Sequence, residues 1–134
     1  MTRKVLAAVL TFSSLVLGAP LLAHHAVESE FNVNKPMTLT GVVTKIEWTN
    51  PHTHFYVDVK DSSGKVTSWT CESSPPLLLR RGGLERNMLP VGQTVTLDGY
   101  AGKDGTTLMW LYRWHLANGA VITINRPVGE SEEK

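Results

Sequence analysis

The fold is decided by one stretch of branched and alternating residues, Leu39-Thr-Gly-Val-Val-Thr-Lys-Ile-Glu-Trp48. β-Branched side chains at alternating positions are typical of a strand that buries one of its faces. The length of the stretch, together with the glycine at position 41, predicts a long first strand with a bulge or strong bend at Gly41.

A second strand is predicted over residues 52–60, after the interruption at Asn50-Pro51. Successive side chains of a strand point to opposite faces, so this segment should present two different surfaces. The face expected to pack into the core carries Thr53, Phe55, Val57 and Val59. The opposite face carries His52, His54, Tyr56 and Asp58.

Four more strands are predicted downstream, over residues 65–72, 93–100, 106–116 and 120–125. Trp69 and Cys71 should share one face of the third strand. Between the third and fourth strands, Ser73-Ser-Pro-Pro76 reads as a serine-capped helix start, and Gly82-Gly83 ends the helix.

This order predicts a mainly β fold: a small OB-like Greek-key β-barrel of five to six strands, with one short helix between strands three and four. The alternative, an immunoglobulin-like sandwich, would need about seven strands and would not ordinarily carry a helix at its centre.

The first 23 residues are typical of a secretory signal. Arg3 and Lys4 precede an apolar run that ends in Leu21-Leu22-Ala23, a small residue at the expected cleavage point. Cleavage there predicts a periplasmic or secreted protein without a membrane anchor. The alternative is retention as an anchor, because the run approaches the ~20 residues that a membrane span needs.

Cleavage would leave 111 of the 134 residues, enough for one domain with its own core. We expect a lead-in over 24–38, the barrel over 39–126 and a polar, acidic tail over 127–134. Without Arg3 and Lys4, the 13 basic residues of the chain fall to 11, against 12 acidic ones. This balance gives no broad electrostatic attraction to nucleic acid or to an anionic membrane, and nucleic acid is not expected as a partner. Cys71 is the only cysteine, so an internal disulfide is excluded and a buried strand position is expected.

Several motifs resemble those of a known family of small exported bacterial proteins, catalogued as a domain of unknown function. The most specific are Trp48-Thr-Asn-Pro-His52 and Leu79-Arg-Arg-Gly82, supported by Ala23-His-His25. Weaker matches are Phe31, Asn34-Lys-Pro36, Leu39-Thr-Gly-Val-Val43, Tyr56-Val-Asp-Val59, Val91-Gly92, Gly99-Tyr100, Lys103-Asp-Gly105 and Asn118-Gly119. The resemblance implies an exported, single-domain, OB-like barrel with no established activity. The stretch Trp110-Leu-Tyr-Arg-Trp114 departs from the family pattern.

The histidines suggest a transition-metal site. Cleavage after Ala23 would make His24 the first residue, and its α-amine and imidazole would form a chelating pair suited to copper, with zinc as a second choice. His25, His52 and His54 could supply further nitrogens. The competing interpretation treats His24 and His25 as terminal surface residues, His52 as a residue that orders the Asn-Pro turn, and His54 as an exposed strand residue.

The alternative function is a metal-free module of the cell envelope that binds a protein or a saccharide through an aromatic barrel face. Trp48, Tyr56, Trp110 and Trp114 are its candidate contacts, provided that the rings of the fifth strand are exposed. No motif of a hydrolase, phosphate loop or zinc protease is present, so we expect a binding protein rather than an enzyme.

Overall fold

The computed structural model of the chain describes residues 26–89 and 91–125. It divides the chain into two units, Met1–Glu30 and Phe31–Lys134. The described part of the first unit is a helical turn over residues 26–30, in which the Ser29 hydroxyl donates to the Ala26 carbonyl at 2.7 Å. The expected signal, the metal candidates His24 and His25, and the acidic tail lie outside the described residues. No helix within the described ranges is long and apolar enough to cross a membrane.

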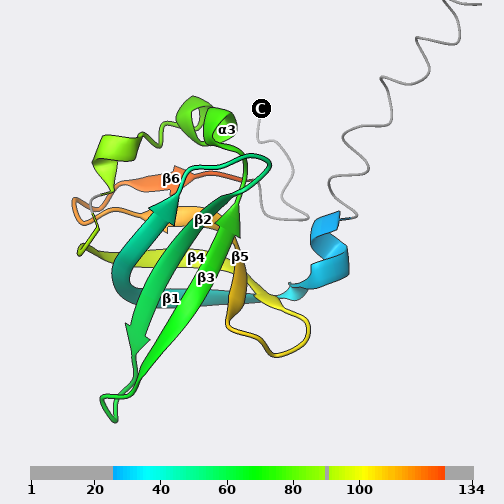
Figure 1. Cartoon of the computed structure of the whole chain (residues 1–134), viewed down its shortest axis with the longest axis vertical. Coiled ribbons are helices and arrows are strands. Elements are labelled where there is room, and N and C mark those ends of the chain that lie inside the picture. Colours follow the sequence, from blue (N-terminus) through cyan, green and yellow to red (C-terminus); the bar gives the residue numbers. More distant parts are fainter. Residues whose placement is uncertain (1–25, 90, 126–134) are drawn as a thin grey trace, which may run out of the picture. The chain divides into compact units, whose positions relative to one another are not determined.

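The second unit is a β-barrel with a short helical connection (Figure 1). Its elements are β1 (Phe31–Glu47), β2 (Thr53–Lys60), β3 (Val66–Ser73), α3 (Pro76–Arg81), η1 (Arg86–Met88), β4 (Thr94–Gly102), β5 (Leu108–His115) and β6 (Val121–Thr123). The strand order is β3-β2-β1-β4-β5-β6, and a parallel pairing between β3 and β5 closes the barrel. A long first strand shared by two antiparallel neighbours, with a helix between β3 and β4, is OB-like. The predicted fold class is therefore confirmed.

β1 begins earlier than the sequence suggested, at Phe31 rather than Leu39. Residues 31–38 were expected to be a lead-in outside the barrel, but they belong to β1, and Phe31 and residues 36–38 pair with β4. The register is irregular between Phe31 and Pro36, which lets the strand accommodate a proline that cannot donate to the ladder.

The predicted bulge of β1 lies farther along the strand than Gly41. The register with β2 shifts between Val43 and Lys45, so Thr44 is the extra residue. Gly41 has a different role, because a Cβ there would lie 2.5 Å from the carbonyl oxygen of Asp58. Around this point β1 curves from its pairing with β4 toward its pairing with β2 (Figure 1).

The two-faced pattern predicted for β2 is confirmed. Thr53, Phe55 and Val57 are fully buried, and Val59 packs against the core. On β3, Cys71 is buried, and Trp69 packs against the same core. Burial raises the pKa of the Cys71 thiol to about 12, which keeps it protonated and unreactive.

The aromatic side chains of β5 do not form one exposed face, so the condition set for a binding surface on this strand is not met. Between Asp98 and Gly99 of β4, two residues of β5 oppose one, so Tyr112 is an extra residue. A single inserted residue moves the following side chains to the other face, and Trp114 therefore points into the core with no exposed surface. Trp110 and Tyr112 are only 9% and 7% exposed.

The helix start also differs from the prediction. α3 has Pro76 in its first turn, as expected, but its N-cap is Pro75, without a side-chain capping bond. Ser73 ends β3, and the Ser74 hydroxyl donates to the side-chain oxygen of Asn125. The serines therefore join β3 to the chain after β6 instead of capping α3.

Candidate metal-binding site at His52 and Glu72

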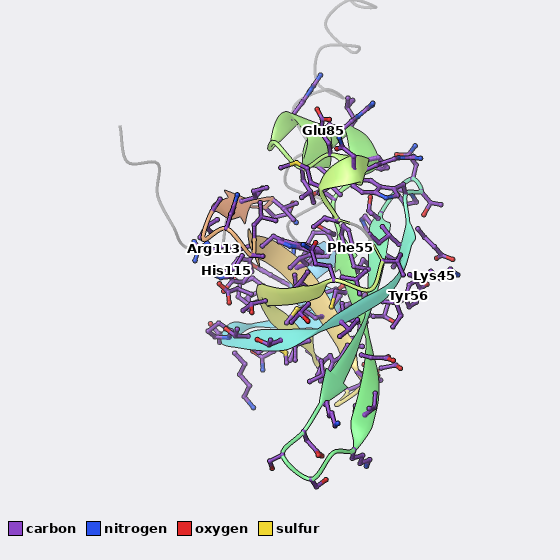
Figure 2. The ribbon with its side chains drawn as sticks, turned by 90° about the vertical axis from the view of Figure 1, so that its left-hand side faces the viewer. Lys45, Phe55, Tyr56, Glu85, Arg113 and His115 are labelled. Atoms are coloured by element: carbon purple, nitrogen blue, oxygen red, sulfur yellow. The ribbon has the colours of Figure 1, made fainter. Side chains whose placement is uncertain are left out.

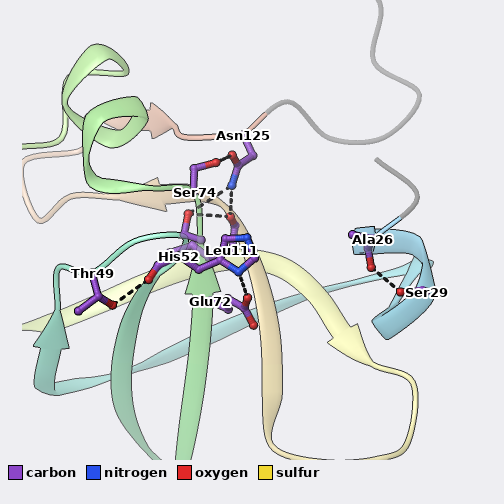
Figure 3. A network of polar contacts seen from close by, with 9 residues as sticks. Ala26, Ser29, Thr49, His52, Glu72, Ser74, Leu111 and Asn125 are labelled. Atoms are coloured by element: carbon purple, nitrogen blue, oxygen red, sulfur yellow. Dashed lines mark hydrogen bonds and ion pairs between the residues drawn. The ribbon is translucent and has the colours of Figure 1, made fainter. Parts of the chain in front are cut away.

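His52 lies in the connection between β1 and β2, just before β2 begins. Its carbonyl oxygen accepts a hydrogen bond from the Thr49 hydroxyl at 3.1 Å, which fixes the backbone of the Asn50-Pro51 turn. Its ring reaches across to β3, where Nδ1 bonds to a carboxylate oxygen of Glu72 (Figure 3). His52 therefore orders the Asn-Pro turn through its backbone carbonyl, as expected, while Glu72 orients its side chain.

The bond to Glu72 determines which nitrogen of His52 is available. An ionised carboxylate only accepts hydrogen bonds, so Nδ1 carries the proton and the Nε2 of the neutral ring keeps its lone pair. Nε2 has no hydrogen-bond partner among the described residues. Of the side-chain surfaces, 39% of His52 and 15% of Glu72 are exposed, so Glu72 is largely enclosed while the imidazole remains accessible.

Trp110 supports the same ring from a second direction. The Trp110 and His52 rings meet edge to face, with centroids 5.3 Å apart and planes at 78°. In the parallel β3–β5 pairing, Trp110 is the register partner of Glu72, which explains why both reach His52. Phe31 covers Trp110 with centroids 5.8 Å apart. Trp110 therefore serves chiefly as packing for His52 rather than as an exposed stacking surface.

His54 lies in a row of charged residues across three strands. Its register partners are Glu47 on β1 and Glu72 on β3. No hydrogen bond joins the His54 side chain to another described residue. The row supplies carboxylates on both sides of an imidazole, an arrangement that would attract a cation.

Glu47, unlike Glu72, is already engaged by its own neighbours. Lys45 Nζ lies 2.5 Å from one of its carboxylate oxygens, and the Tyr56 hydroxyl donates to the other at 2.9 Å. The Lys45 bond and then the Tyr56 bond lower the pKa of Glu47, with a smaller contribution from His54. Lys45 also lies 5.1 Å from the centre of the Tyr56 ring. Tyr56 is therefore part of an ion-paired cluster rather than a free aromatic contact.

The remaining aromatic candidates divide into covered and buried residues. Trp48 is partly buried, with the Arg86 guanidinium 5.4 Å from its ring centre and the Phe55 ring edge-on at 6.0 Å. Trp114 packs on Phe55 inside the barrel with centroids 5.0 Å apart, so it cannot contact a ligand at the surface. Trp114 therefore cannot belong to the expected aromatic face, and Trp110 has little exposed surface to contribute to it.

The described part of the chain does not hold a complete metal site by itself. Over residues 26–89 and 91–125, no three His, Cys, Asp or Glu side chains converge closely enough to bind an ion. His52, and His54 at its side, can therefore supply only part of a coordination sphere.

Glu72 is the residue that the sequence interpretation missed. The hairpin around Asp61-Ser-Ser-Gly64 fixes the register of β2 against β3, and that register places Glu72 opposite His54 and within reach of His52. Counting outward from the loop is the signal that could have found it.

A second histidine–carboxylate pair lies elsewhere on the barrel. His115 Nε2 is 2.7 Å from Asp98, which also accepts a hydrogen bond from the Thr38 hydroxyl at 2.7 Å. His115 lies on the side of the barrel away from Lys45 and Tyr56 (Figure 2). It takes no part in the site of His52.

Comparisons with known proteins give a family and a distant structural likeness. No curated protein matches the chain significantly. Among solved structures, the dimeric N-terminal domain of PriB protein from Thermoanaerobacter tencongensis is similar over 57% of this chain and 90% of that chain, with 21% identity and a TM-score of 0.40. The model of a family of unknown function, DUF6152, matches residues 13–109, well over half of the chain. The chain therefore belongs to the DUF6152 family.

Proposed function

We propose that this protein is an exported metal-binding protein of the cell envelope, in which His52 offers Nε2 to a transition-metal ion, copper above all. The observation that carries the proposal is the hydrogen bond between His52 Nδ1 and Glu72. Metal-binding histidines almost always use their second ring nitrogen in this way, because the carboxylate fixes the tautomer and makes the ligating nitrogen more basic. Trp110 adds an apolar support on another side of the ring.

The rest of the coordination sphere is proposed to come from the N-terminus. After cleavage behind Ala23, the α-amine and imidazole of His24 would provide two nitrogens, with His25 as a third source. Together with His52, and with His54 where it reaches, this gives the nitrogen-rich set that suits Cu(II). The proposed role is binding rather than catalysis, and the proposed location is the periplasm or the exterior of the cell.

The proposal is tested by titrating Cu(II), with Zn(II) in parallel, into the exported and processed protein. The N-terminus should first be verified by mass spectrometry, because an added methionine or tag would block the amine of His24. In the proposed site, His52→Ala weakens Cu(II) binding at least tenfold, since losing a supporting partner alone typically costs that much.

The chain offers a closely matched control in His115. Its side chain is 38% exposed and its Asp98 partner 15%, almost the same as the His52–Glu72 pair. His115→Ala should leave Cu(II) binding unchanged. Equal losses in the two variants would indicate nonspecific imidazole binding and contradict the proposal.

A further inference from the structure

The connection between β3 and β4 carries a surface that the metal site does not use. We call it the arginine–leucine cap and define it by its exposed side chains: Leu77, Leu78, Arg80, Arg81, Arg86, Met88 and Val91. Its four apolar members are between 39% and 61% exposed. Four of the seven large apolar side chains exposed in the described part of the chain therefore lie within this one segment.

The cap is held firmly on the barrel. Leu79, Leu84 and Leu89 recur at every fifth position and are almost completely buried. Leu79 lies within α3, and η1 lies between Leu84 and Leu89, at the end of the barrel marked by Glu85 in Figure 2. The apolar residues around the anchors are thus presented outward by a packed segment.

Positive charge gathers on the same segment. Residues 76–91 contain three arginines and one acidic residue, Glu85, and so carry a net charge of +2, whereas the whole chain carries +1. The remainder is therefore net negative. Within the described residues, neither Arg80 nor Arg81 forms an ion pair. Arg86 holds its guanidinium 5.4 Å from the centre of the Trp48 ring.

Exposed leucines interleaved with unpaired arginines are complementary to an anionic phospholipid surface. Apolar side chains can enter the boundary between headgroups and acyl chains, while arginines keep their charge among the phosphates. We propose that the arginine–leucine cap docks this protein on an anionic membrane surface. The Leu79-Arg-Arg-Gly82 motif then has two roles: Leu79 anchors the segment, and Arg80 and Arg81 face the lipid. This docking does not depend on the metal site.

The test is co-sedimentation of the processed protein, in EDTA, with vesicles of phosphatidylethanolamine and phosphatidylglycerol, compared with phosphatidylcholine vesicles. The protein should bind the anionic vesicles, and the binding should weaken as salt is raised. Arg80→Gln with Arg81→Gln should weaken it roughly 25-fold, from about fivefold for each charge. Leu77→Ser with Leu78→Ser should weaken it by about tenfold, because two half-exposed leucines no longer enter the boundary.

The matched control removes the same charge from exposed positions on the β2–β3 hairpin. Lys60→Gln with Lys65→Gln should change binding by less than about twofold, because these lysines lie outside the cap. A nonspecific effect of net charge would instead weaken binding equally in the lysine and arginine pairs. Circular dichroism verifies that each variant is folded, and both arginines have exposed side chains, so their replacement should leave the barrel intact.

Three results would overturn the proposal. One is equal binding to neutral and anionic vesicles. Another is equal loss in the arginine and lysine pairs. The third is no binding to anionic vesicles at millimolar lipid, which would leave a protein partner as the occupant of the cap.

Discussion

Replacing Glu72 with glutamine tests whether metal binding depends on the hydrogen bond from His52 to a carboxylate, and not only on the presence of His52. The amide oxygen of glutamine can still accept the hydrogen bond from Nδ1, so the ring keeps its position, but the carboxylate charge is lost. A charge-assisted hydrogen bond is roughly twice as strong as a neutral one, so the imidazole becomes less firmly held.

The structure sets the size of the two expected effects. The His52 side chain is 39% exposed, so the pair is partly screened by solvent and its loss should lower the free energy of unfolding by no more than about 1 kcal/mol. Metal affinity should respond more strongly, because loss of a ligand's hydrogen-bond partner typically weakens binding by about 10- to 100-fold. Glu72→Gln should therefore remain folded while losing affinity for copper.

Calorimetric titration of Cu(II) measures this loss, and Glu47→Gln is its control. Glu47 lies on the other side of His54, so the same charge is removed from the same row without touching His52. Glu47→Gln should stay within about threefold of the parent protein, since its carboxylate is already engaged by Lys45 and Tyr56. Copper affinity unchanged in Glu72→Gln, or lowered equally in both variants, would refute the role given to the His52–Glu72 bond.

Three further predictions concern the barrel. Trp114→Ala should lower the free energy of unfolding by about 3–5 kcal/mol, because removing a fully buried ring leaves a cavity beside Phe55. Val121→Ala, at an exposed position, should cost less than about 0.5 kcal/mol in the same thermal melts. Similar melting temperatures for the two variants would contradict the buried position of Trp114. Cys71, with its pKa raised to about 12, should not react with a thiol reagent at pH 8 until the protein is unfolded in urea, and rapid labelling of the folded protein would show the burial to be wrong. Burial raises the pKa of Asp98, but hydrogen bonds from His115 and Thr38 outweigh it and hold the pKa below 3.8. The carboxylate therefore stabilises the fold above pH 3.8, and this stabilisation is lost as the pH falls through the folded-state pKa. In urea melts, Asp98→Asn should lose less stability in acid than the parent protein, and identical pH profiles would contradict this.

The parts of the fold that followed from the sequence are those in which local patterns agree with burial. The alternation in β2 predicted which side chains enter the core, because one face of that strand is buried and the other is only half-buried. The short helix between β3 and β4 followed from Pro76 and the two glycines after it, and together with the strand order it was enough to predict an OB-like barrel.

The parts that did not follow depend on pairing between distant strands. Regular alternation along β5 would place Trp114 on the same face as Trp110, and only the bulge opposite Asp98 and Gly99 turns it inward. Serines before a helix are typical N-caps, but the Ser74 hydroxyl donates instead to Asn125, some fifty residues later. Both outcomes are set by partners that no local window contains.

The site was predicted in part for the same reason. His52 and His54 stood out by their spacing, and the structure places them on the barrel beside carboxylates. Glu72 and Trp110, which orient His52, reach it only through the β2–β3 and β3–β5 pairings. The proposed contribution of His24 stays a prediction, because that residue lies outside the described part of the chain.

The most direct test of the central claim compares two forms of the protein in one Cu(II) titration. One form begins at His24, as verified by mass spectrometry, and the other carries a single extra alanine ahead of it. We expect submicromolar binding by the first form and a loss of at least tenfold in the second, because the extra residue removes the α-amine that His24 would add to the His52 imidazole. Binding no tighter than micromolar in the first form, or equal binding in the two, would contradict it.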